Sequence, residues 1–332
     1  MKNHGMNPYL PSWEYVPDGE PHVFGKRVYI YGSHDRFAGY AFCQNDYVCW
    51  SAPVDDLTDW QYEGIIYTRA EAAHNEDGRQ CLYAPDVTCG PDGRYYLYYA
   101  LNETSAISVA VCDTPAGKYT YYGDVHYPDG TTLGARPGDE QQFDPGVLTE
   151  GKTTWLYSGF CPPMMPGRTG ALCYRLASDM LTVEQTYPAV VPGAQTAKGT
   201  GFEGHAFFEA SSIRKVGDKY YFIYSSELSH ELCYAVSDSP CRGFISSVAA
   251  LCAVRLCPAA AKAVFASHVS AEPAAHMVLD ALGKAPLITA NLHLGEGTGA
   301  VASIPLWDMA LAVYRGCYSF AEGGIVPYTP QC

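Results

Sequence analysis

A unit made of an acidic residue followed by a strand hairpin recurs along the first 243 residues, and it is the strongest constraint on the fold. Its clearest copy is QQFDPGVLTEGKTTWLYSGF at residues 141–160, where an acid leads a short apolar step, a polar turn and an aromatic run. Alternation of Tyr, Ile and Val with period 2 predicts strands, and a short Gly-containing turn between two such runs predicts a hairpin. The acids of the four copies are Asp18, Asp86, Asp144 and Glu209.

A second, weaker repeat follows each hairpin and consists of an apolar strand and a Ser/Asp/Pro turn. Its copies read YVCWSAPVDDL, ISVAVCDTPAG, LCYRLASDML and LCYAVSDSPCRG. Each period therefore holds about four strands, which is the content of one blade of a β-propeller. Because the first strand of every blade lines the central axis, acids at equivalent positions are predicted to face one shared pocket.

Composition agrees with a β-rich, soluble protein. The 27 tyrosines favour sheets, and a net charge of −14 argues against nucleic acid and anionic membranes as partners. The N-terminus has no apolar signal region, and no later apolar run is long enough to span a membrane. The thirteen cysteines include no CxxC pair and lie mostly in apolar runs, where a thiol packs as a small hydrophobe. We therefore expect a reduced, cytoplasmic protein.

The sequence changes character abruptly near Gly243. The aromatic alternation stops, and an Ala-rich stretch with apolar residues at helical spacing begins, interrupted at Pro258. Further on, a Gly-rich turn at residues 295–299 opens another predicted helix. We therefore predict a β-propeller domain over residues 1–243 and an α-helical segment over residues 244–332.

The repeated acids suggest a chemistry. Two carboxyl groups on either side of a glycosidic bond suffice for hydrolysis, because one protonates the leaving oxygen and the other activates water. The acid must keep its proton near neutral pH, which burial or a neighbouring carboxylate arranges. Three acids in one pocket therefore predict a base, an acid and a residue that tunes the acid, and nearby aromatic rings suit sugars.

Other interpretations of these acids stay open. Aspartates often cap turns at strand starts, and this alternative is strongest for Asp86. Glu20 and Glu203 lie close in sequence to two of the predicted catalytic acids, and the nearby histidines lack metal-ligand spacing. We expect no required cofactor, while a calcium ion held by acids and carbonyl groups at the axis is compatible with the pattern.

Residues 7 to about 243 resemble glycoside hydrolase family 43. The resemblance rests on NPYLPSWEYVPDGEPHVFGKRVYIYGSHD, LYAPDVTCGPDGRYYLYY, FDPGVL and FFEASSIRK, in this order. It implies an all-β propeller of the five-bladed type, truncated here to four blades. It also implies hydrolysis, with inversion, of α-L-arabinofuranosyl or β-D-xylosyl linkages in arabinose- or xylose-containing oligosaccharides.

The same resemblance implies roles for individual residues. Asp18 would be the general base that activates water, and Glu209 the general acid. Asp144 would orient the acid and raise its pKa, while Asp86 and Phe143 would contact the substrate. Asp18 departs from the family pattern, because the residue after it is not the usual proline.

The C-terminal part, residues 243–329, resembles the end of nicotinate-nucleotide:dimethylbenzimidazole phosphoribosyltransferase, an enzyme of cobamide assembly. The matching stretches are GFISSVAAL, AVRLCPAAAKAVFASHVSAEP, LGEGTGA and SFAEGGI. By this resemblance Glu296 would be the catalytic base of an alternative site, although a Gly-rich helix cap is the simpler interpretation of its surroundings. The larger N-terminal part of that enzyme has no counterpart here.

The chain therefore reads as a fusion of two incomplete enzymes joined near Gly243. Our first expectation is a glycosidase impaired by the loss of its fifth blade. The alternatives are a phosphoribosyltransferase acting through the tail and a propeller that binds sugars without cleaving them.

Overall fold

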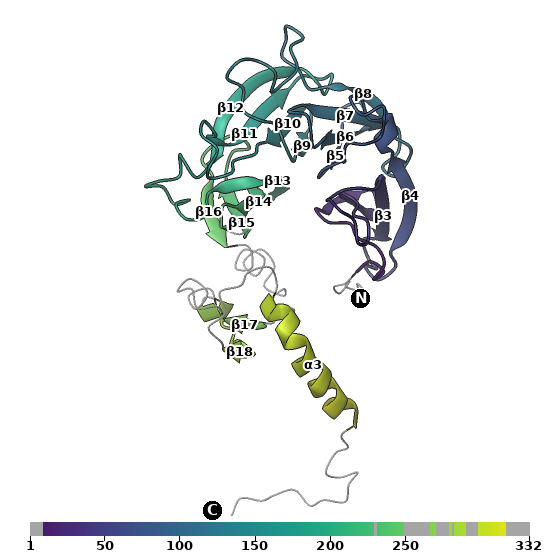
Figure 1. Cartoon of the computed structure of the whole chain (residues 1–332), viewed down its shortest axis with the longest axis vertical. Helices are drawn as coiled ribbons and strands as arrows, with labels where there is room; N and C mark the ends of the chain where they lie inside the picture. The colour runs from purple at the N-terminus through teal and green to yellow at the C-terminus, as the bar shows by residue number, and fades with distance from the viewer. Residues whose placement is uncertain are drawn as a thin grey trace, which may run out of the picture. The chain divides into compact units, whose positions relative to one another are not determined.

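The computed structural model describes residues 9–228, 231–248, 266–269, 279–280, 282–289 and 298–316. The chain divides into two compact units between Ala249 and Ala250, and each unit is described by itself. The first unit contains four antiparallel sheets of four strands each, which follow one another around an axis as the blades of a propeller (Figure 1). The predicted four blades are therefore confirmed.

Each blade is built from four consecutive strands, and every strand is hydrogen-bonded to the next one in the chain. The predicted content of one period, a hairpin followed by a further apolar strand and its partner, is thus confirmed. The blades comprise β1 (Glu20–Phe24), β2 (Arg27–Tyr31), β3 (Tyr47–Pro53) and β4 (Gln61–Tyr67); β5 (Asp86–Cys89), β6 (Tyr95–Ala100), β7 (Ile107–Cys112) and β8 (Thr120–Asp124); β9 (Gly146–Glu150), β10 (Thr153–Ser158), β11 (Gly170–Leu176) and β12 (Val183–Pro192); β13 (Phe207–Val216), β14 (Lys219–Ser226), β15 (Leu232–Ser237) and β16 (Ile245–Val248).

Strand β6 explains why the sequence is so rich in tyrosine. Successive side chains of a strand point to opposite faces of the sheet. Leu97 and Tyr99 accordingly pack into the core shared with the first blade, whereas Tyr96 and Tyr98 pack into the core shared with the third. A strand between two blades is buried on both faces, so it is apolar or aromatic at every position. The described residues form three such cores, one at each junction between consecutive blades.

The first and fourth blades lie at the two ends of the arc in Figure 1. A short N-terminal segment covers the free face of the first blade: the Trp13 ring lies 6.2 Å from that of Trp50, and Glu14 accepts a hydrogen bond from the Trp50 indole. On the fourth blade, the face turned away from the third blade is more open. Leu232 and Ile245 on this face are each 65% exposed, as expected for a blade without a following neighbour.

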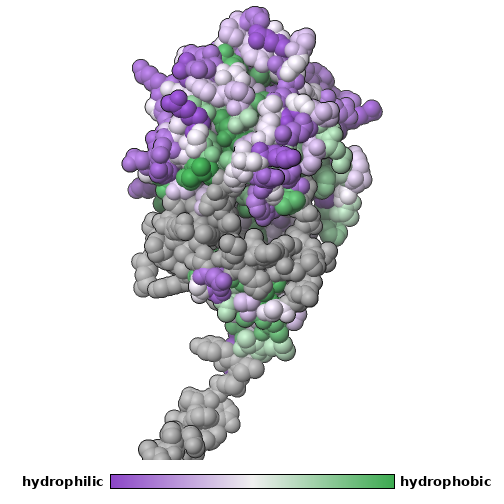
Figure 2. Space-filling view, turned by 90° about the vertical axis from the view of Figure 1, so that its left-hand side faces the viewer, coloured by the Kyte–Doolittle hydropathy of each residue, from purple (hydrophilic) through white to green (hydrophobic). Residues whose placement is uncertain are grey.

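The outer strands carry the polar surface of the first unit. Part of β12 alternates between exposed and more buried positions. Figure 2 shows the corresponding side of the molecule, where polar side chains lie on both sides of a strip of apolar groups. Within the described residues, no helix is long and apolar enough to cross a membrane.

The structure corrects the prediction that the chain is helical from residue 244 onward. Residues Ile245–Val248 form β16, the outer strand of the fourth blade, because they pair with the otherwise unpaired edge of β15. The C-terminal unit also contains a short parallel pair, β17 (His268–Val269) and β18 (Ile288–Thr289). The helix predicted after the Gly-rich turn is confirmed as α3 (Thr298–Gly316). Pro258 and Glu296 lie outside the described residues.

Candidate active site

The backbone at the predicted catalytic acids has an unusual conformation. Asp18, Asp144 and Ala210, the residue after Glu209, all have left-handed φ angles, of 55°, 44° and 62°. A residue with a side chain adopts this conformation at a cost of roughly 1–3 kcal/mol, and such residues concentrate at functional sites. The pairing of β13 with β14 is also irregular around Glu209. These local distortions direct the acids away from the regular positions of their strands.

A glycine brings the third and fourth blades together beside the acids. Gly146 follows the Asp-Pro pair at the start of β9, and a Cβ atom there would lie 2.4 Å from the carbonyl oxygen of Ser211 on β13. Only glycine allows the two inner strands to approach so closely. The FDPG stretch therefore combines a candidate catalytic acid with the residue that lets the neighbouring blade pack against it.

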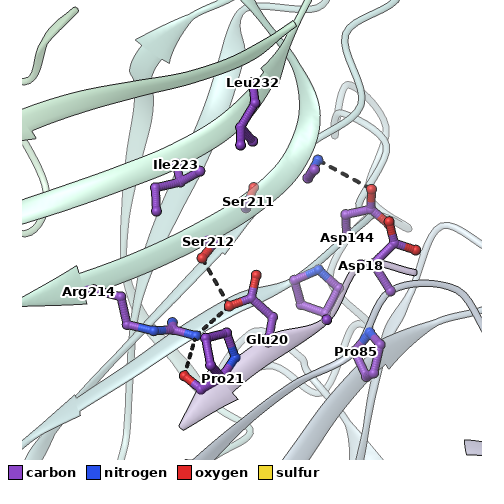
Figure 3. A pocket seen from close by; sticks show the side chains of 14 residues that line it. Asp18, Glu20, Pro21, Pro85, Asp144, Ser211, Ser212, Arg214, Ile223 and Leu232 are labelled. Atoms are coloured by element: carbon purple, nitrogen blue, oxygen red, sulfur yellow. Dashed lines mark hydrogen bonds and ion pairs between the residues drawn. The ribbon is translucent and has the colours of Figure 1, made fainter. Parts of the chain in front are cut away.

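The acids meet at a cavity of about 340 Å³ between the inner strands. Figure 3 shows the carboxyl groups of Asp18 and Asp144 next to each other in this cavity. Glu209 lies beside them. The residue that follows it, Ala210, donates a backbone N–H hydrogen bond of 3.2 Å to Asp144 Oδ2. Asp18 accepts a short hydrogen bond from the Ser33 hydroxyl. The structure thus brings together the three acids that the repeat pattern predicted; their catalytic roles stay predictions.

Burial and nearby carboxyl groups raise the pKa values of all three acids. Burial, the charge of Glu209 and the charge of Asp18 raise the pKa of Asp144 well above its ordinary value. Burial and the charge of Asp18 raise the pKa of Glu209 to about 7. Burial also raises the pKa of Asp18, against the opposing hydrogen bond from Ser33. Glu209 is therefore partly protonated near neutral pH, which is what a general acid requires.

The structure places Asp86 at the propeller axis, between the inner strands of the blades. Its side chain is completely buried. One carboxylate oxygen lies 2.5 Å from His22 Nε2, and the other accepts a 2.7 Å hydrogen bond from the N–H of Val147. Asp86 is not among the residues that line the cavity, and its predicted contact with the substrate stays a prediction. Asp86 is not a turn cap: it joins the first three blades at the axis.

Phe143 belongs to a row of four half-buried aromatic rings next to the acids. Its ring centroid lies 5.1 Å from that of Tyr83 and 5.2 Å from that of Phe160, which in turn lies 5.4 Å from Phe208. Tyr83 is close enough to Asp144 and Glu209 for their charges to raise its pKa further, after the effect of burial. Of these rings, only that of Phe143 was predicted to contact the substrate, although the other three rings lie in the same quoted stretches of sequence.

The axis also holds charged residues that the motif analysis did not single out as functional. Glu20 and Arg214 both line the cavity and form an ion pair, and Ser212 donates a 3.0 Å hydrogen bond to the same carboxylate oxygen (Figure 3). Arg214 lies in the FFEASSIRK stretch, two residues after Ser212, so period 2 places both side chains on one face. That alternation was the one signal in the sequence that could have identified Arg214 as a residue of the axis.

These residues do not form a suitable calcium site. Ligand atoms of Glu20, His22 and Asp86 lie within 4.8 Å of one another, as metal ligands would. However, the guanidinium group of Arg214 contacts Glu20 and lies 3.2 Å from His22 Nε2 and 4.0 Å from Asp86 Oδ2. A divalent cation among these ligands would meet a fixed positive charge at close range. We therefore derive no role for calcium here.

Comparisons with known proteins divide the chain in the same place as its composition. Residues 14–243 match the family described as glycosyl hydrolases family 43, and residues 241–325 match a phosphoribosyltransferase family. A xylosidase/arabinosidase from Thermoclostridium stercorarium is 64% identical over 244 residues, which is 74% of this chain and 52% of that protein. The chain thus spans about half the length of this relative.

Two further matches support the same division. A nicotinate-nucleotide–dimethylbenzimidazole phosphoribosyltransferase from Acetivibrio thermocellus is 44% identical over 89 residues, which is 27% of this chain and 25% of that enzyme. Among solved structures, a family 43 β-xylosidase/α-arabinofuranosidase from a compost metagenome, in complex with xylotriose and free of calcium, has a TM-score of 0.57. It is 22% identical and the match covers 74% of this chain and 80% of that one, so the likeness bears on the fold.

Proposed function

The chain belongs to glycosyl hydrolases family 43, and from this premise we propose that its propeller hydrolyses α-L-arabinofuranosyl or β-D-xylosyl linkages with inversion. The observation that carries the proposal is the clustering of three carboxyl groups with raised pKa values, two of which, those of Asp18 and Asp144, line one cavity. A relative named xylosidase/arabinosidase supports the choice of sugars.

The proposed mechanism uses the three acids in separate roles. Asp18 takes a proton from a water molecule, whose oxygen attacks the anomeric carbon. Glu209 donates its proton to the glycosidic oxygen as the bond to the anomeric carbon breaks. Burial and the charge of Asp18 keep Glu209 partly protonated near neutral pH, and we assign to Asp144 the role of orienting Glu209 and raising its pKa further. Proton exchange with solvent then restores both catalytic groups.

The aromatic row beside the acids supports a sugar as substrate. Tyr83, Phe143, Phe160 and Phe208 present half-buried rings, and the apolar face of a pentose packs well against such a surface. We propose that this row, with Phe143 at its centre, orients arabinose- or xylose-containing oligosaccharides toward the acids.

Release of nitrophenol from nitrophenyl arabinofuranoside and xyloside tests the proposal, and NMR of the first-formed sugar anomer tests inversion. Glu209→Gln should abolish turnover of an oligosaccharide substrate, whereas Glu203→Gln, an exposed acid six residues earlier, should not. Binding of xylo-oligosaccharides without any turnover by the unaltered chain would instead favour the sugar-binding propeller without catalysis.

We expect the activity to be impaired, because the cavity is bounded on one side by the open face of the fourth blade. Ile223 and Leu232 of that face line the cavity. Grafting a fifth blade from a related hydrolase should raise the turnover rate by orders of magnitude. The graft belongs after Val248, because β16 is the last strand of the fourth blade. Turnover by the chain as it stands at a rate of about 10 per second would contradict this expectation.

The second candidate function is phosphoribosyl transfer through the tail, favoured by the match of residues 241–325. The tail corresponds to about a quarter of the matching enzyme, so we expect no such activity. Incubation with nicotinate mononucleotide and dimethylbenzimidazole, followed by mass detection of α-ribazole phosphate, tests this. Formation of that product would move the function of the chain to its C-terminal unit.

We also propose that the protein works in the cytoplasm. Nine cysteines among the described residues are free thiols, and six of them are buried. Buried free thiols are compatible with a reducing compartment. Subcellular fractionation of the producing cell, with antibody detection, checks this.

A further inference from the structure

Four ionisable side chains meet at the propeller axis beside the candidate catalytic acids. Glu20 and His22 come from β1, Asp86 from β5 and Arg214 from β13. The cluster therefore links the first, second and fourth blades. Because the first and fourth blades are the two ends of the arc, these contacts join the ends at the axis.

Arg214 carries the positive charge of this cluster. His22 Nε2 lies 2.5 Å from an oxygen of Asp86, so this nitrogen bears a hydrogen and donates it. Burial lowers the pKa of His22, which leaves the imidazole neutral near pH 7. Two carboxyl groups, Glu20 and Asp86, are then balanced by one guanidinium group. Its Nη2 donates to Glu20 and to the carbonyl oxygen of Pro21, while Nη1 faces Asp86 at 4.0 Å.

We propose that Arg214 is a positioning residue that takes the place of a divalent metal ion at the axis, holding Glu20 and Asp86 together and thereby joining the fourth blade to the first two. A guanidinium group suits this role because it presents several donors in a fixed plane and stays charged at every relevant pH. The proposal does not depend on which sugar the cavity accepts.

Burial explains why the cluster needs a cation. Asp86 is completely buried and the Glu20 side chain is 18% exposed, so water screens their charges poorly. Leaving such carboxylates without a cation is strongly destabilising, whereas removing both members of a pair often costs little. The outer ion pair of the same strand, between Lys215 and Glu150 at 2.7 Å, is more exposed and should contribute little.

Thermal unfolding of the full chain tests the proposal, with Arg214→Met compared with Lys215→Met. Both variants remove one positive charge from β13, but only the first removes it from the axis. We expect the melting temperature to fall by about 10 °C for Arg214→Met and by less than about 3 °C for Lys215→Met. Equal shifts in the two variants would overturn the proposal.

A second pair of variants separates the loss of charge balance from a general loss of packing. Glu20→Gln combined with Arg214→Met should be more stable than Arg214→Met alone, because the buried carboxylate no longer lacks a cation. This comparison stands even where Arg214→Met yields little folded protein. A double variant that is less stable than the single one would show that Arg214 contributes packing only.

Metal binding provides the third test. The substitution Arg214→Ala leaves space between Glu20, His22 and Asp86. Calcium or manganese ions at millimolar concentration should therefore raise the melting temperature of this variant by several degrees. The same ions should raise the melting temperature of the unaltered protein no more than they raise that of Lys215→Met. Two results would overturn the proposal. The first is that calcium stabilises the unaltered protein and that Glu20→Gln abolishes this stabilisation. The second is that metal ions do not change the melting temperature of Arg214→Ala.

Discussion

Two groups of acids lie near the propeller axis, Asp18, Asp144 and Glu209 in the first and Glu20 and Asp86 in the second, and they differ in the charges around them. In the first group, Asp18, Asp144 and Glu209, the charges that act on the carboxyls come from other carboxyls, so burial and repulsion both raise the pKa values. In the second group, burial alone would raise the pKa of Asp86, but the contacts with His22, Arg214 and the Val147 N–H lower it below its ordinary value.

The comparison shows how one fold gives carboxyl groups near the same axis raised and lowered pKa values. Asp86 is the first residue of β5, whereas Asp144 lies two residues before β9 begins, so the two acids differ by two residues in their place within the repeat. An acid surrounded by other acids holds a proton and can donate or exchange it, whereas an acid tied to a cation and a backbone N–H stays ionised and fixed in place. Asp86 differs from Asp144 both in its place within the repeat and in its contacts with His22, Arg214 and the Val147 N–H.

The largest expected effect comes from removing the acid of the first group. Glu209→Gln should lower the turnover of a xylo- or arabino-oligosaccharide by about 10²–10⁴-fold. The loss should be smaller with a nitrophenyl glycoside, because nitrophenolate leaves without protonation. Steady-state kinetics on the two substrate types measure this. Equal losses on both would remove Glu209 from the role of general acid.

The matching change in the second group should affect stability. Asp86→Asn removes the charge that balances Arg214 and weakens the hydrogen bonds to His22 and Val147, so we expect a loss of about 3 kcal/mol in the free energy of unfolding. Urea denaturation measures it. Asp144→Asn serves as the control. The pKa of the Asp144 carboxyl is raised, so this group favours its neutral form and the substitution removes less charge than Asp86→Asn does. If Asp144→Asn destabilises the protein as much as Asp86→Asn, the distinction between the two groups fails.

The pH dependence of stability should report both groups. Burial raises the folded-state pKa values of Glu209 and Glu20 from the ordinary value of 4.5 to about 7. These two groups bind protons more tightly when folded, so their contribution is present below pH 4.5 and is lost as the pH rises toward 7.

We therefore expect the free energy of unfolding to fall by on the order of 2–3 kcal/mol per group between pH 4.5 and pH 8. Asp86 acts in the opposite direction, because its lowered pKa contributes stability that is lost in acid. Urea titrations at several pH values measure the trend. Glu20→Gln and Glu209→Gln should each flatten it, and an unchanged slope in both variants would contradict the raised pKa values.

The smallest predicted effect is a shift in a pH profile. The charge of Glu209 raises the pKa of Asp144. The proposed tuning role of Asp144 requires the reverse effect as well, so under the proposal Asp144→Asn should lower the pKa of Glu209. The alkaline limb of the activity profile should then move to lower pH by about one unit. A profile measured on an otherwise folded, weakly active variant checks this; an unmoved limb would leave Asp144 with a structural role alone.

Local sequence determined much of the fold. The alternation in YYLYYA and its counterparts specified the strands, and the spacing of the repeats specified four blades, because strand formation and side-chain phase depend on neighbouring residues. Local pattern failed at Ile245–Val248, where pairing with the edge of β15 outweighed the helical character of the following sequence. The three acids of the first group were also identified from their repeat positions.

Tertiary structure alone decided what each acid does. Asp86 and Asp144 look alike in sequence, but His22 lies 64 residues from Asp86 in the chain and Arg214 lies 194 residues from Glu20. A carboxyl group's pKa depends on burial and on charges within a few ångströms, and both are set by which distant strands meet at the axis. The repeat pattern led to both acids being assigned to one pocket, and only the packing of the blades gave them different neighbours.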